Sequence, residues 1–132
     1  MNDAPLKNWI PYKLASTETG INCFWLDAAN EPFTEPFFDE TISKLIYRRR
    51  AYSSTNSLST LEMMKQLGSL LNDACPGAII FHISRCGSTL ISQMLSTSPK
   101  CTVLAEVPFL DDILRLPLKH TAIDETAVNS LF

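Results

Sequence analysis

The chain has 132 residues, enough for one domain, and it is 45% hydrophobic and 19% charged, like an ordinary globular protein. Its formal net charge of −3 argues against wholesale nucleic-acid binding, so any anion site must be local. The N-terminus has no secretory pattern, and the apolar run Ala78–Phe81 is far shorter than the ~20 residues of a membrane helix.

The four cysteines, at positions 23, 75, 86 and 101, and the two histidines show no zinc-ligand spacing. We therefore expect no metal and free thiols in a reducing cytoplasm. These features predict a cytoplasmic protein with neither a membrane nor a nucleic-acid partner.

Residues 1–20 are polar and contain two prolines, which predicts irregular structure. The aromatic and β-branched run 21–26 predicts a strand. Thr34 is a candidate helix cap. The helix after it has one apolar face at helical spacing, made by Phe38, Ile42, Leu45 and Ile46.

Three consecutive arginines, Arg48, Arg49 and Arg50, end this predicted helix. They are either a phosphate contact or a solvated helix end, where cations are favoured, and the second interpretation is the simpler. After a polar loop at 51–58, Ser59 and Glu62 form a capping-box pattern before a second helix.

The second half of the chain alternates apolar runs with helical patterns. Residues 78–83 read as a strand buried on both faces, 89–96 as a helix and 101–105 as another strand. A further helical pattern covers Phe109–Leu116, and another lies at 124–132. Strand, helix and strand in succession predict a βαβ unit with a parallel sheet.

The stretch 84–89, "SRCGST", joins the first of these strands to its helix. A helix N-terminus has unpaired N–H groups and a partial positive charge, so it favours anions. Gly87 lets backbone amides approach a phosphate, Ser88 and Thr89 add hydroxyls, and Arg85 adds a planar fork of donors. An ordinary strand–helix turn is the structural alternative.

Two better-known phosphate loops do not match. The nucleotide motif G-x-x-x-x-G-K-[ST] requires a lysine before the hydroxyl, and none precedes Ser88. A Cys-x5-Arg phosphatase loop is absent, because no arginine lies six residues after Cys86.

The segments "SRCGSTLISQML" and "LAEVPFLDDIL" together resemble the PAPS-dependent sulfotransferases, in the bacterial and tyrosylprotein-sulfotransferase-like branch whose phosphosulfate loop carries arginine. The resemblance covers about residues 77–116. It implies a P-loop α/β fold, with 77–132 as the start of the core and 1–76 as a preceding segment of a strand and helices. Family members have later elements for the 3′-phosphate and adenine, and we find no match for them after residue 116. We therefore expect an incomplete domain that has little or no turnover alone.

By this resemblance, PAPS (3′-phosphoadenylyl sulfate) is the co-substrate and the acceptor is an unknown small molecule, glycan or peptide. The loop binds its 5′-phosphosulfate, and the binding residues carried over are Arg85, Cys86, Gly87, Ser88, Thr89 and Leu90. Arg85 stabilises charge during transfer, and Glu106 is the catalytic base. Cys86 replaces the usual serine, so any contact there would be mainly through its backbone N–H.

Alternatives remain for this region. Glu106 is either the base or an exposed carboxylate that caps the Pro108 helix. The whole chain is alternatively a small-molecule kinase-like phosphotransferase, or a non-catalytic anion-binding module. His82 lies in a strand pattern and is expected to be a core histidine, and Asp111 and Asp112 favour a helix start.

Overall fold

The computed structural model describes residues 8–17, 20–29, 31–50, 57–70 and 76–120. The predicted helical pattern at 124–132, Cys75, and the side chains of Arg49 and Arg50 lie outside this description. The elements are β1 (Trp9–Thr17), β2 (Gly20–Asp27), α1 (Phe38–Arg50), β3 (Ser57–Thr60), α2 (Leu61–Leu70), α3 (Ser88–Ser96), α4 (Pro108–Leu114) and α5 (Leu116–Lys119).

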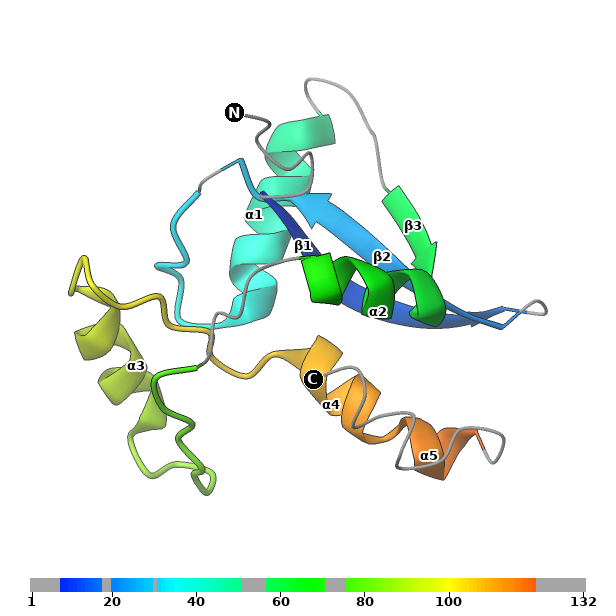
Figure 1. Ribbon diagram of the computed structural model, residues 1–132. Coiled ribbons are helices and arrows are strands. Elements are labelled where there is room, and N and C mark those ends of the chain that lie inside the picture. Colours follow the sequence, from blue (N-terminus) through cyan, green and yellow to red (C-terminus); the bar gives the residue numbers. More distant parts are fainter. Residues whose placement is uncertain (1–7, 18–19, 30, 51–56, 71–75, 121–132) are drawn as a thin grey trace.

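The sheet has three antiparallel strands in the order β1–β2–β3 (Figure 1). Strand β1 replaces the irregular structure predicted for residues 9–17, and the remainder of that prediction falls mostly on residues outside the description, 1–7, 18 and 19. Its register shifts between Pro11 and Lys13, and β1 lies at the edge of the sheet, where a proline is tolerated. At the end of this hairpin the Thr17 hydroxyl donates to the Gly20 carbonyl at 2.9 Å.

Both faces of the sheet are covered, because β2 sends alternate side chains to opposite sides. On one face Cys23 and Trp25 pack with residues of α2, α4 and α5, namely Met64, Phe109, Ile113 and Leu116. On the other face Leu26 packs with the predicted apolar face of α1, namely Phe38, Ile42 and Leu45. The described core is therefore three layers, with helices on either side of the sheet.

The helix starts differ from two of the predicted caps. Helix α1 begins at Phe38, four residues after Thr34, so Thr34 is not its cap. At α2 the N–H of Met63 donates to the Thr60 hydroxyl at 3.2 Å, so the capping-box prediction at Ser59 is wrong. Ser59 is instead buried in β3 and accepts a hydrogen bond from the Trp25 indole at 2.7 Å.

The predicted parallel sheet is not supported, although the chain does mix helices with strands. Neither 78–83 nor 101–105 is a strand in the structure. A strand needs a neighbour that completes its hydrogen-bond ladder, and an apolar sequence does not provide one. Within the described ranges these segments flank α3 without a ladder partner, and α3 lies to one side of the sheet (Figure 1). Phe81 is 92% exposed as a result.

Surface ion pairs account for several charged residues singled out above. Arg48 binds Glu31 at 2.5 Å, which favours a role at the protein surface over a phosphate contact. Asp111 binds Arg115 at 2.8 Å and Asp112 binds Lys119 at 2.9 Å, both within the α4–α5 region. In the parts of the chain that the structure describes, no helix is long and apolar enough to cross a bilayer.

Candidate functional site

The loop that enters α3 has two residues with left-handed backbone. Arg85 has φ = 62° and Gly87 has φ = 87°. Gly87 precedes the first residue of α3, Ser88, and no side chain caps this helix N-terminus. Residues Arg85, Cys86, Thr89 and Leu90 are exposed, and Ser88 is half-buried. The predicted binding loop is therefore open to solvent, with the first amide groups of α3 unoccupied by a side-chain cap.

Glu106 is the second predicted catalytic residue with a left-handed backbone, at φ = 50°. Non-glycine residues rarely adopt positive φ, and such conformations cluster at functional sites. Among the described residues only Ala29 shares this property with Arg85 and Glu106. Two of these three residues are thus the ones that the sequence singled out for catalysis.

Glu106 does not cap the helix that follows it. Val107 occupies the N-cap position of α4, and no side chain forms a cap hydrogen bond there. The capping alternative for Glu106 is therefore wrong in this structure. Its side chain is 54% exposed and does not cap α4.

The backbone on both sides of Glu106 is anchored. The Ala105 carbonyl accepts a hydrogen bond of 3.0 Å from the Phe38 N–H, one of the unpaired donors in the first turn of α1. Val107 packs against both core clusters. Because its two neighbours are held by α1 and by the core, the position of the Glu106 backbone is set by the fold.

A hydrogen bond joins helix α3 to the segment before α1, since the Gln93 amide donates to the Thr34 carbonyl at 3.3 Å. Much of the helix surface remains uncovered: Leu90 and Met94 are 66% and 65% exposed, and no residue of α3 is buried. Burial therefore contributes little to holding this helix, in contrast to α4.

One contact joins the two predicted halves of the site. His82 Nε2 lies 3.9 Å from Glu106 Oε1, which brings Glu106 beside the run that leads into the loop. The prediction of a core histidine is wrong, because the His82 side chain is 31% exposed. Sequence reasoning missed this pair because a histidine within an apolar run resembles a buried residue, and no spacing rule links positions 82 and 106.

The charge of Arg85 is not neutralised within the described part of the chain, where no carboxylate lies within ion-pair distance of its guanidinium. Arg85 and Glu106, both among the described residues, are not joined by an ion pair. Among the described side chains, no group of three or more potential ligands is arranged to hold a metal ion. The functional groups that this candidate site offers are thus the Arg85 guanidinium, the backbone amides of the loop and the Glu106 carboxylate.

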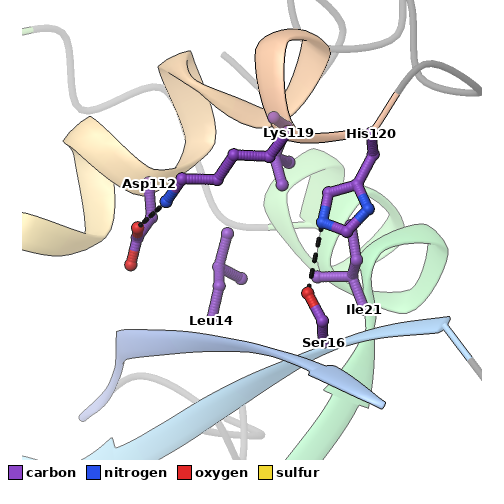
Figure 2. A pocket seen from close by; sticks show the side chains of 7 residues that line it. Leu14, Ser16, Ile21, Asp112, Lys119 and His120 are labelled. Atoms are coloured by element: carbon purple, nitrogen blue, oxygen red, sulfur yellow. Dashed lines mark hydrogen bonds and ion pairs between the residues drawn. The ribbon is translucent and has the colours of Figure 1, made fainter. Parts of the chain in front are cut away.

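A separate hollow lies between β1 and the α4–α5 region (Figure 2). There the Ser16 hydroxyl and His120 Nε2 form a 3.1 Å hydrogen bond beside the Asp112–Lys119 ion pair (Figure 2). Leu14, Ile21 and Leu116 supply its apolar lining. None of the predicted site residues lines this hollow, and its polar groups bind one another.

The described cysteines differ in burial, with Cys23 in the core and Cys86 and Cys101 at the surface. Cys23 is fully buried, and burial raises the pKa of its thiol from 9.0 to about 12, against a smaller lowering by the Ser59 hydrogen bond. Cys86 and Cys101 are exposed and, like Cys23, form no disulfide. Cys23 is therefore a packing residue, whereas Cys86 lies within the predicted binding loop.

Comparisons with known proteins identify no relative: no family model, no curated protein and no solved structure matches this chain.

Proposed function

We propose that the chain is sulfotransferase-like, binding the 5′-phosphosulfate of PAPS through Arg85–Leu90 and transferring the sulfuryl group to an acceptor hydroxyl or amine. The observation that carries this proposal is the 3.9 Å contact between His82 and Glu106. It brings a carboxylate beside the run that enters an uncapped helix N-terminus. An anion site and a base are the two functions that sulfuryl transfer needs.

The loop supplies the anion site. Left-handed residues in a tight loop direct successive N–H groups toward a common concavity, and such arrangements bind anions. The N-terminus of α3 adds its partial positive charge, and Arg85 adds a full charge with paired donors that match phosphate or sulfonate oxygens. The unpaired state of Arg85 among the described residues supports this role.

Glu106 supplies the base. In the proposed reaction it takes the proton from the acceptor while the acceptor oxygen or nitrogen forms its bond to sulfur. The bond between that sulfur and the leaving phosphate oxygen breaks, and Arg85 with the loop amides stabilises the charge on the phosphate. The anchored backbone at Ala105 and Val107 supports such a role, because a base must be held near the proton it removes.

The test is calorimetric titration of the 132-residue chain with PAPS, with PAP (its desulfated product), and with ATP in the presence and absence of Mg²⁺. We expect PAPS and PAP to bind without metal and more tightly than ATP. Mg²⁺-dependent binding of ATP in preference to PAPS would instead support a phosphotransferase. Absence of binding by all three nucleotides at millimolar concentration would contradict the proposal.

Arg85→Ala should weaken PAPS binding roughly 10-fold or more, because hydrogen bonds to charged groups are worth about 1.5–3 kcal/mol. Arg85→Lys should retain part of the affinity, since lysine keeps the charge but not the fork. Arg48→Ala is the matched control, because Arg48 is engaged with Glu31 and should leave the affinity unchanged. Equal affinities for the Arg85→Ala and wild-type proteins would remove Arg85 from the site.

A further inference from the structure

His82 is held between a backbone carbonyl and the Glu106 carboxylate. Its Nδ1 lies 3.4 Å from the carbonyl oxygen of Ile83, and its Nε2 lies 3.9 Å from Glu106 Oε1. The ring therefore presents one nitrogen to its own backbone and the other to the carboxylate. The second distance is within ion-pair range but longer than a hydrogen bond.

Glu106 needs a partner to act as a base. The backbone beside it is anchored, but its side chain is 54% exposed and has three torsions that solvent leaves free. A general base must lie about 2.6–3.2 Å from the proton it removes, and catalytic hydrogen bonds often shorten only when substrate is bound. Among the described residues, His82 is the one whose side chain lies within ion-pair distance of this carboxylate.

We propose that His82 is a positioning residue: with a proton on each ring nitrogen, its Nδ1–H faces the Ile83 carbonyl and its Nε2–H restricts the Glu106 carboxylate to the rotamer in which Oε1 lies beside the ring. This inference deepens the proposed function and rests on it for the role of Glu106. His82 itself touches neither the nucleotide nor the acceptor in this account. Its position three residues before Arg85 links the conformation of the base to the segment that enters the anion loop.

Two substitutions of His82 distinguish a positioning role from a packing role: glutamine keeps a comparable N–H donor, and phenylalanine does not. Glutamine carries an amide N–H at a reach similar to Nε2, whereas phenylalanine keeps a ring of similar shape without a donor. If His82 only fills space, His82→Phe should behave like the wild type. If it positions Glu106, His82→Gln should behave like the wild type and His82→Phe should not.

The experiment measures three-bond scalar couplings across χ1 of Glu106 by NMR, on the isotope-labelled full chain without nucleotide. We expect a single rotamer in the wild type and in His82→Gln. In His82→Phe the couplings should move toward the average of the three staggered rotamers. His120→Phe is the control, because the other histidine of the chain binds Ser16 and should leave Glu106 unchanged.

Averaged couplings in the wild type, unchanged couplings in His82→Phe, or averaging in His82→Gln would each overturn the proposal. Should the phenylalanine variant fail to fold, the wild type still decides: nuclear Overhauser effects between the His82 ring and the Glu106 methylenes are expected, and their absence would overturn it. Because the NMR experiment uses no nucleotide, a failure to bind PAPS would refute the sulfotransferase proposal without changing the result for the Glu106 rotamer. Conversely, if PAPS binds but the Glu106 side chain rotates freely, the positioning role of His82 is refuted and the sulfotransferase proposal is unaffected.

Discussion

Ser59→Ala tests how the core is held together beneath β2. The Trp25 indole N–H donates to the Ser59 hydroxyl at 2.7 Å, and both residues are buried, at 5% and 6% exposed. Alanine leaves this N–H without an acceptor in a site that water does not reach. An unsatisfied buried donor costs about 1–3 kcal/mol, so we expect the free energy of unfolding to fall by about that amount.

The measurement is urea denaturation followed by Trp fluorescence, with thermal melting as a second readout. A chain of this size loses roughly 4 °C of Tm per kcal/mol. Ser69→Ala is the matched control, because its hydroxyl donates to the Gln66 carbonyl on an exposed helix surface and its loss should change stability by less than about 0.5 kcal/mol.

A double-mutant cycle with Trp25→Phe isolates the hydrogen bond. Phenylalanine removes the indole donor, so the further cost of Ser59→Ala should be smaller in that background than in the wild type. Two additive single-mutant effects, or a Ser59→Ala loss no larger than that of Ser69→Ala, would refute the reasoning.

Three further predictions follow from the backbone and the cysteines. Gly87→Val should lower stability by about 1–2 kcal/mol, because φ = 87° is strained for a β-branched residue even though a Cβ there meets open space. It should also abolish PAP binding measured by calorimetry, because the side chain would block the approach of the phosphate to the loop amides. Unchanged PAP affinity would show that the loop is not part of the site. Gly68→Ala should raise the Tm, since Gly68 lies in α2 with nothing within 4 Å of a new Cβ and alanine is favoured in a helix by roughly 0.5–1 kcal/mol; a lower Tm would contradict this. The pKa of Cys23 is raised to about 12, so the unfolded chain loses this proton at lower pH than the folded chain, and stability should fall between about pH 9 and 12 by up to ~1.4 kcal/mol per pH unit. In denaturation series over that range Cys23→Ala should have a shallower slope than the wild type, and an equal slope would count against the burial of this thiol.

Helical periodicity was the most reliable guide to the fold. The spacing of Phe38, Ile42 and Leu45 predicted the buried face of α1, and the pattern at 89–96 predicted α3 to within one residue. The prediction for α1 holds in full because an apolar stripe at period 3.6 favours a helix with that stripe turned inward. For α3 only the helix itself is confirmed, since none of its residues is buried.

Strand predictions were less accurate, because the pairing of a strand depends on a second segment that its own sequence does not identify. The run 21–26 falls within β2, but β1 was missed, because Pro11 signals irregular structure unless the strand is known to lie at an edge. The runs 78–83 and 101–105 have strand composition without a ladder. Composition reports a preference for burial, whereas a ladder also requires a neighbouring backbone.

The candidate site was predicted by residue type and not by geometry. The sequence singled out Arg85, Gly87 and Glu106, and whether they act as predicted stays untested. It gave no sign that Arg85 and Glu106 have positive φ, because neither residue type favours that conformation. The His82–Glu106 contact depends on how 78–83 lies beside Glu106, which local patterns do not specify.

The most direct measurement of the central claim is an amide NMR titration of the labelled chain with PAPS and with adenosine 5′-phosphosulfate, which lacks the 3′-phosphate. Because the proposed site grips the 5′-phosphosulfate, both ligands should shift the amide signals of Cys86, Gly87, Ser88 and Thr89, and Gly87→Val should abolish these shifts. Amide shifts that cluster instead at the hollow near Lys119 and His120, or no shifts at millimolar ligand, would contradict the account.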